Sequence, residues 1–401
     1  MKKSFFKLLP VSIVLFLFSC TGSSSQGKND GEDSTKKQVV VKFDHTYDEV
    51  ARYIAGMPLR DSIIPQELQN DTWKKYCADM DSNWGKMEDT RLKQMRAWTA
   101  ENLKNENANP GTVWYPFSGP DMVHVYQFFP NANKYILMAM EFPGSLPKVT
   151  KMNSTQAVTY LTNLKGALKE VMERSYFITS FMSKAVSGNA KGTVPIICLF
   201  LVRSGNEIID IKKYHLNDDG TKTPLTNDSS LIGIKNDFAE IDFRKIGSDK
   251  IQKVVYVSCN LSNDYYPDTK IPGLRVNKAL YNWMNTETKD CYTYLKAASY
   301  LPHNGGSGFM GMIDSMMLNH SKTVLQDDTG LPLKYFSADK WKISVFGNYS
   351  KPIADFSKLG MGYQPDLQKL YDAGNVGKMD FSLGYHFKDQ INQNLLLAQK
   401  K

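Results

Sequence analysis

Helical and strand patterns of apolar residues alternate along most of the chain. Spacings of three and four residues predict helices over residues 47–54, 66–105 and 154–186. A continuous apolar run over residues 135–142 predicts a buried strand that ends at a Pro-Gly pair. The N-terminal half is therefore expected to combine a helical region with a buried central strand.

Strand patterns dominate between residues 190 and 260. The apolar run over residues 194–203 predicts a buried strand, and the alternating run over 207–216 is expected to be its hairpin partner. Residues 232–245 and 253–260 continue the strand pattern. Most of the predicted sheet therefore falls in this part of the chain.

Both patterns recur toward the C-terminus. Helices are predicted over residues 276–284 and 309–325, and short strands over residues 334–336, 341–346 and 381–387. The whole pattern indicates an α/β or α+β protein, with a mixed β-sheet flanked by helices and a helical N-terminal region.

The composition supports a large folded unit. Of the 401 residues, 42% are hydrophobic and 12% aromatic, which excludes a chain disordered over most of its length. A soft boundary near residue 190 would divide a helix-rich part, 39–190, from a mixed-sheet part, 191–401. Because both patterns recur on each side, one continuous domain over 39–401 is the alternative.

The first residues have the pattern of an export signal. Lys2, Lys3 and Lys7 form a positive start, and the apolar run over residues 8–18 is too short to span a bilayer, which takes roughly 20 residues. Residues 1–19 are therefore predicted to be a signal peptide rather than a membrane-spanning helix.

This leader ends in Leu17-Phe18-Ser19-Cys20, which resembles the lipobox of bacterial lipoproteins. The resemblance implies cleavage before Cys20, a diacylglycerol thioether on its sulfur and an acylated amino terminus, so that membrane lipid is the first partner. Several acyl chains make a stable anchor. An ordinary signal peptide with a chance cysteine is the alternative.

Residues 20–38 are predicted to be a flexible tether, since Thr21 to Gln38 include no aliphatic or aromatic residue. Asp30, Glu32 and Asp33 loosely resemble the acidic tract that routes some lipoproteins to the cell surface. The expected location is the outer membrane, at the cell surface or on its periplasmic face.

The charge excludes one class of partner. The net charge is +8, and the three leader lysines supply three of these charges, which leaves +5 after cleavage. An excess this small and this evenly spread gives no reason to expect nucleic-acid binding.

Four cysteines remain after Cys20, at positions 77, 198, 259 and 291, and they allow three disulfide pairings, which stay open. Cys198 and Cys259 lie in apolar runs, where a free cysteine acts as a small hydrophobic residue. The chain has no Cys-x-x-Cys pair and no Cys/His cluster, so neither a zinc site nor a cofactor is expected.

Several segments resemble an uncharacterised family of bacterial exported proteins. They are Tyr115-Pro-Phe-Ser-Gly-Pro-Asp121, Phe128-Phe-Pro-Asn-Ala132, Tyr135-Ile-Leu with Glu141, Tyr294-Leu-Lys-Ala-Ala-Ser-Tyr300 and Leu325-Gln-Asp-Asp-Thr-Gly-Leu-Pro-Leu333. The similarity spans roughly residues 110–390 and implies one fold unit. The family has no assigned activity and supplies no catalytic residues.

The first candidate site surrounds Ser118, Gly119, Asp121 and His124. Serine, histidine and an acid are the residue types of nucleophilic catalysis, but the Gly-x-Ser-x-Gly elbow is absent. Ser118 as a helix N-cap explains the pattern without catalysis. A pocket here is the third reading, because a Gly/Pro-rich helix start can receive an anion or a sugar hydroxyl.

The second candidate site is Gln326-Asp327-Asp328, followed by Thr329-Gly330. Adjacent carboxylates can bind a divalent cation or act as acid and base. An Asp-rich turn whose side chains bond the backbone is the simpler interpretation.

Two functions are compatible with these observations. The first is a non-catalytic lipoprotein that binds an envelope protein or glycan, or has a structural role. The alternative is a surface hydrolase of glycans or esters that uses Asp327 and Asp328, with Glu141 or Asp121 as a further carboxylate. Because every catalytic template fails, the sequence favours the binding protein.

Overall fold

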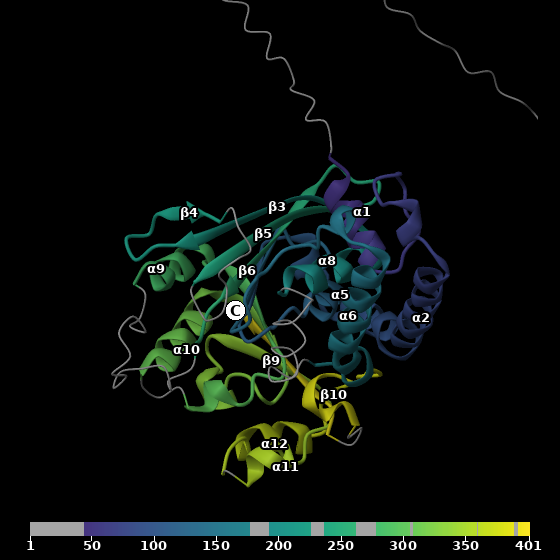
Figure 1. The fold of residues 1–401 in the computed structure, drawn as a ribbon. Coiled ribbons are helices and arrows are strands. Elements are labelled where there is room, and N and C mark those ends of the chain that lie inside the picture. The colour runs from purple at the N-terminus through teal and green to yellow at the C-terminus, as the bar shows by residue number, and fades with distance from the viewer. Residues whose placement is uncertain are drawn as a thin grey trace, which may run out of the picture. The chain divides into compact units, whose positions relative to one another are not determined.

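The computed structural model describes residues 44–176, 192–225, 236–261, 278–304, 308–358, 360–388 and 392–401 (Figure 1). The predicted leader, the tether and residues 39–43 lie outside these ranges. Phe43–Lys401 forms one unit, which contains all of the described helices and strands. Within the described residues, no helix is both long and apolar enough to cross a bilayer.

A mixed sheet runs through the unit, with eleven strands among the described residues. Its centre is a parallel block in the order β8-β7-β1-β2-β6. The bounds are β1 Thr112–Tyr115, β2 Lys134–Ala139, β6 Ile251–Ser258, β7 Cys291–Leu295 and β8 Ser321–Gln326. The mixed sheet predicted from the sequence is thus confirmed.

Antiparallel strands extend both sides of this block. Beyond β6 lie β5 (Asp237–Lys245), β3 (Asn206–Leu216) and β4 (Lys222–Pro224). Beyond β8 lie β11 (Asn394–Lys400) and β9 (Trp341–Gly347), and β10 (Val376–Gly377) pairs in parallel with β9. The sheet therefore joins strands from about the last sixty residues of the chain to earlier strands, of which the first begins at Thr112.

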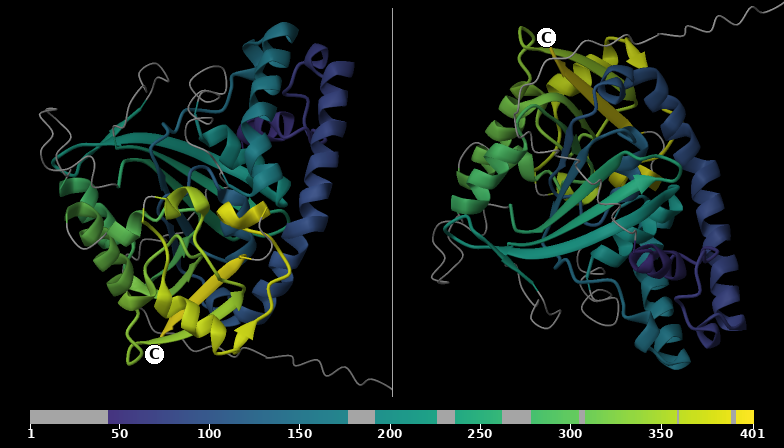
Figure 2. Two further views of the ribbon diagram at one scale, coloured as in Figure 1. Left: turned by 90° about the horizontal axis from the view of Figure 1, so that it is seen from below. Right: turned by 90° about the horizontal axis from the view of Figure 1, so that it is seen from above.

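Helices cover both faces of the sheet, as predicted (Figure 2). One core contains Val113 and Tyr115 of β1 together with the N-terminal helices, whereas Trp114 lies in the other core with α9 and α10. The N-terminal helices are α1 Thr46–Ile54, α2 Asp71–Met87, α3 Lys93–Asn102, α4 Lys104–Ala108, α5 Met122–Phe128, α6 Ser154–Arg174 and α8 Val194–Arg203. The later helices are α9 Lys278–Glu287, α10 Gly308–His320, α11 Ala354–Ser357 and α12 Pro365–Asp372.

Local sequence explains where the long helices begin. The Asn70 side chain accepts hydrogen bonds from the backbone N–H groups of Thr72 and Trp73 and so caps α2. Asn153 and Gln156 form a reciprocal capping box at the start of α6. A π-helical turn, Glu88–Leu92, joins α2 to α3 and brings Arg91 into the core.

The strand predicted over residues 194–203 is wrong, because this segment is helix α8. Val194 through Val202 are all buried, so apolar residues surround the helix and no amphipathic period is visible. Pro195 lies in its first turn, where a proline is well tolerated. The predicted hairpin partner is a strand, β3, but it pairs with β4 and β5.

Three other predictions need correction. The helix predicted over residues 309–325 ends at His320, and β8 follows directly, since Ser321 to Gln326 is a buried run without a turn signal before it. The strands predicted over 334–336 and 381–387 fall at short 3-10 helices, Leu333–Tyr335 and Gly384–Lys388. Apolar runs as short as these fit a helix and a strand equally well.

The four cysteines of the described unit are free thiols. Cys198 and Cys259 are buried, which agrees with their treatment as small hydrophobic residues, and Cys291 is buried as well.

Candidate functional site

A cavity lies at the carboxyl edge of the parallel strands. The chain after β1 leaves through α5 on one face of the sheet, whereas the chain after the neighbouring β7 leaves through α10 on the other face. Neighbouring strands whose connections leave on opposite faces form a crevice at their carboxyl ends, which is where open α/β sheets bind ligands. The topology therefore places a site between β1 and β7.

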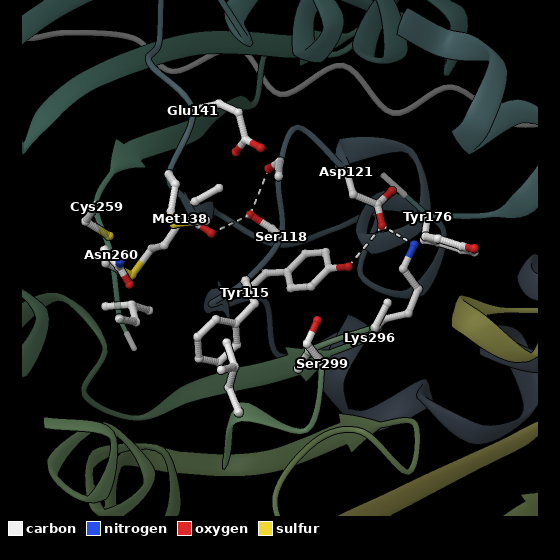
Figure 3. A pocket seen from close by; sticks show the side chains of 18 of the residues that line it. Tyr115, Ser118, Asp121, Met138, Glu141, Tyr176, Cys259, Asn260, Lys296 and Ser299 are labelled. Atoms are coloured by element: carbon white, nitrogen blue, oxygen red, sulfur yellow. Dashed lines mark hydrogen bonds and ion pairs between the residues drawn. The ribbon is translucent and has the colours of Figure 1, made fainter. Parts of the chain in front are cut away.

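The cavity measures about 440 Å³. Figure 3 shows side chains that line it. It is lined by the segments that follow four parallel strands: Tyr115 to Asp121, Met138 to Glu141, Cys259 to Leu261, and Lys296 to Leu301, together with Tyr176 and Tyr385. Small-molecule sites in proteins typically have this size and position.

The base of the cavity holds a buried ion pair. Asp121 Oδ2 contacts Lys296 Nζ and accepts a hydrogen bond from the Tyr115 hydroxyl, 3.0 Å away. Asp121 Oδ1 lies 2.6 Å from His124 Nδ1 and accepts a hydrogen bond from the His124 backbone N–H, 3.3 Å away. All four side chains are almost completely buried.

Lys296 has two hydrogen-bond acceptors among the described residues. Its ammonium group contacts Asp121 Oδ2 and donates to the Ser175 carbonyl oxygen, 2.6 Å away. His124 Nδ1 lies 3.1 Å from Lys296 Nζ but only 2.6 Å from Asp121 Oδ1, so we assign the Nδ1 hydrogen to the carboxylate. Because an Nδ1 atom that carries this hydrogen has no lone pair for Lys296, the third ammonium hydrogen has no acceptor among these groups.

Burial and charge set the protonation states of this cluster. Burial lowers the pKa of His124 to about 3, so the imidazole is neutral at physiological pH. Burial would raise the pKa of Asp121, but the His124 and Lys296 side chains outweigh it and hold the pKa below its ordinary value. Burial lowers the pKa of Lys296, which the Asp121 charge opposes. We therefore describe Asp121 and Lys296 as an ion pair.

A second buried cation, Arg91, lies near this pair. It donates to the carbonyl oxygens of Val171 and Met172, and burial lowers its pKa to about 10, against the opposing charge of Asp121. Within the described residues, its Nε and Nη1 atoms and His124 Nε2 have no hydrogen-bond partner. Asp121 is therefore the principal counter-charge for two buried cations.

The backbone is strained around the cavity. Phe117, Ala297 and Ser299 line it and have positive φ angles between 52° and 62°. The adjacent Ser175 and Tyr300 also have positive φ angles. Non-glycine residues adopt such angles at a cost of order 1–3 kcal/mol each, and they concentrate at functional sites. This strain is a second, independent sign that the cavity is a site.

Ser118, Gly119, Asp121 and Glu141, predicted as candidates, all line this cavity. The N-cap of α5 is Asp121 and not Ser118, because Asp121 directly precedes the helix and accepts from His124. The hydrogen bonds of Ser118 Oγ among the described residues go to the carbonyl oxygens of Gly119 and Met138. Ser118 is therefore not positioned by His124 as a nucleophile.

Gln326 ends β8, Asp327 lies in the turn that follows it, and neither residue lines the cavity. Asp327 accepts hydrogen bonds from the backbone N–H groups of Ala297 and Thr329, at 2.8 and 3.0 Å. Burial, helped by the charge of Asp328, raises its pKa to about 6. Gln326 bonds both backbone groups of Leu331. These contacts are those of a turn whose side chains bond the backbone.

Asp328 is also occupied by its neighbours. It accepts hydrogen bonds from the Tyr300 hydroxyl at 2.8 Å and from the Asn394 amide at 3.1 Å, and it lies 3.1 Å from His386 Nε2. Its carboxylate is completely buried. Among the described residues, no group of three or more His, Cys, Asp or Glu side chains could hold a metal ion.

Sequence reasoning missed Lys296 and Arg91. A signal for Lys296 existed, since it directly follows the buried strand Cys291–Leu295, and a charged residue there is typical of a site at a carboxyl edge. Arg91 gave no such signal, because it lies among charged residues of a helical segment.

A comparison with protein-family models found no match for this chain, and a comparison with curated proteins found none either. The chemistry of the site itself is therefore the basis for assigning a function.

Proposed function

We propose that this protein is a lipid-anchored envelope protein whose globular unit binds a small ligand in the cavity between β1 and β7 without changing it chemically. The anchor part of the proposal is supported by the lipobox resemblance at Cys20. The binding part is supported by the position of the cavity and by the strained residues around it.

One observation carries the choice of binding over catalysis: the ionisable groups at the cavity base are engaged with one another. A nucleophile or general base needs a free lone pair directed at its substrate. The ammonium group of Lys296 has no lone pair, and both oxygens of Asp121 are occupied. His124 Nε2 has a lone pair without a partner among the described residues, but His124 does not line the cavity. These residues shape and charge the cavity floor rather than react.

The hydrolase hypothesis lacks comparable support. Asp327 and Asp328 lie outside the cavity lining, and both are bonded to neighbouring backbone and side-chain groups. Glu141 and Asp121 do line the cavity, but Asp121 is held by Lys296. The geometry gives this hypothesis no pair of free carboxylates.

The test uses the full chain and a deproteinised, low-molecular-mass extract of the producing cells' envelope. We expect the extract to raise the thermal midpoint of the wild type, because a ligand that binds only the native state stabilises it. Ala139→Phe fills the cavity and should abolish this shift. Ala373→Phe, at an exposed position, should retain it.

Two results would contradict the proposal. The first is the absence of any shift with the wild type. The second is a shift accompanied by consumption of the extract component, seen by mass spectrometry as a substrate lost and a product formed, which would identify an enzyme.

A further inference from the structure

We infer that the ligand of this cavity is a neutral, polyhydroxylated ring, the chemistry of a sugar residue. This inference rests on the proposed function, since it names the class of ligand that the same cavity would bind. Three features of the cavity support it: the charge of the floor, the aromatic walls and the hydroxyl groups of the lining.

The charge of the cavity disfavours an anionic ligand. Among the described lining residues, Lys296 is the only lysine or arginine, and its ammonium group is already held by Asp121 and the Ser175 carbonyl oxygen. A phosphate or carboxylate would compete with Asp121 for this buried ammonium group, and separating a buried ion pair is strongly unfavourable. Glu141 adds a second acidic side chain to the lining.

The walls present partly exposed aromatic rings. Phe117, Tyr176 and Tyr385 all line the cavity, and none of the three is fully buried. The Tyr176 and Tyr385 rings meet at 71° with centroids 4.9 Å apart, so the two rings differ in orientation at the same place. Flat rings offer a large apolar area at little cost in side-chain entropy. The C–H face of a sugar ring is an apolar surface that fits against such a wall.

Two of the lining residues carry hydroxyl groups that contact each other. Ser299 Oγ and the Tyr385 hydroxyl lie 2.7 Å apart, and only one of the two hydrogens can lie between them. Among the described residues no acceptor takes the second hydrogen, and both oxygens keep lone pairs for a donor. A ligand hydroxyl satisfies both needs because it donates and accepts. An apolar ligand would leave this hydrogen and these lone pairs without a partner, which costs free energy.

The test uses the full-length protein with free glucose, galactose and N-acetylglucosamine as neutral probes, and glucose 6-phosphate as the anionic probe. Saturation-transfer NMR and calorimetry measure binding. We expect at least one neutral sugar to bind and the phosphate ester to bind more weakly than its parent sugar. Tyr385→Phe keeps the ring and removes the hydroxyl, so the affinity should fall about 2- to 10-fold, as expected for one hydrogen bond.

Two further variants locate the effect. Phe117→Ala removes a wall and should weaken sugar binding, whereas Tyr363→Phe makes the same hydroxyl deletion at a residue that is 55% exposed and outside the cavity, and should change nothing. Thermal midpoints without ligand confirm that each variant is folded.

The outcomes separate the two proposals. Tighter binding of the phosphate ester, or binding of no neutral sugar while the envelope extract still shifts the thermal midpoint through the cavity, overturns the sugar inference and leaves the proposed function standing. If neither the sugars nor the extract bind, both proposals fail together.

Discussion

Asp121 is the residue on which the interior of the site depends. It caps α5, accepts the Tyr115 hydroxyl and neutralises buried cations from two distant parts of the chain. Such a residue stabilises the fold through charges that would otherwise be costly to bury. The same arrangement removes its carboxylate from chemistry with a ligand.

The first prediction concerns this carboxylate. Asp121→Asn leaves Lys296 and Arg91 without their buried counter-charge, so the free energy of unfolding should fall by about 3–5 kcal/mol. Urea denaturation measures this free energy of unfolding. Lys74→Ala, which breaks the exposed pair with Asp71, is the control and should cost less than about 1 kcal/mol. Equal losses in the two variants would show that the buried pair is not essential.

The second prediction concerns Asp314 of α10. Its side chain is 3% exposed, and neither oxygen has a hydrogen-bond partner within the described residues. Burial raises its pKa from 3.8 to about 8. The native state therefore retains this proton at pH values where the unfolded chain has lost it, so the contribution of Asp314 to stability is lost as pH rises from about 4 to about 8.

Asp314→Asn removes this titration. The variant should gain a few kcal/mol of unfolding free energy relative to the wild type at pH 8, and the gain should shrink toward pH 4. Unfolding free energies at the two pH values give the comparison. A difference between wild type and variant that does not change with pH would contradict the assignment.

At the scale of elements, α8 shows how a helix can escape detection. Nine of its ten residues are buried, and it packs against α1, α5 and β3. A helix that is apolar on every side is held by its surroundings rather than by its own amphipathic pattern. Its stability should therefore depend on close packing along its whole circumference.

The third prediction tests this packing. Leu199→Ala in α8 deletes a fully buried side chain and should cost about 2–5 kcal/mol, the range for a cavity in a well-packed core. Met312→Ala on α10 is the matched control, because that methionine is 41% exposed and its loss should cost far less. If both variants had the same denaturation midpoint, α8 would not be a core helix.

At the scale of the whole molecule, the sheet joins distant parts of the chain. The parallel block combines β1 and β2 with strands that begin after residue 250, and β11 at the C-terminus pairs with β8. The cavity takes its lining from four of these strand ends. The lining residues lie between Tyr115 and Tyr385, so no part of the chain shorter than this stretch contains the whole site.

The fourth prediction concerns where this unit is held. Cys20→Ala should move the full-length protein from the membrane fraction to the soluble fraction, because the variant lacks the thiol that we propose carries the lipid. Cys77→Ala, which changes another free thiol, should leave the protein membrane-bound. Retention of the Cys20 variant in the membrane fraction after a carbonate wash would contradict lipid anchoring.

The sequence by itself determined the fold class and the neighbourhood of the site. The helix over residues 47–54, the start of the helix predicted over 154–186 and the strand in 135–142 followed from local spacing, which a chain retains before it folds. The helix that begins at Ser154 ends at Arg174, earlier than predicted, because Ser175 adopts a left-handed conformation; residues 177–186 lie outside the described residues. The turn after β1 was marked by its Gly and Pro residues and by Ser118 and Asp121. The sequence also predicted a candidate site at the aspartates after β8, although these residues belong to a turn.

Only the tertiary structure decided what those residues do. It made residues 194–203 a helix, because burial on every side removes the periodicity that distinguishes helix from strand. It placed Lys296 against Asp121, which lies 175 positions earlier in the chain, through parallel strands whose connections carry no local signal. Strand order depends on packing between distant elements, and that order alone placed the ends of β1 and β7 around one cavity.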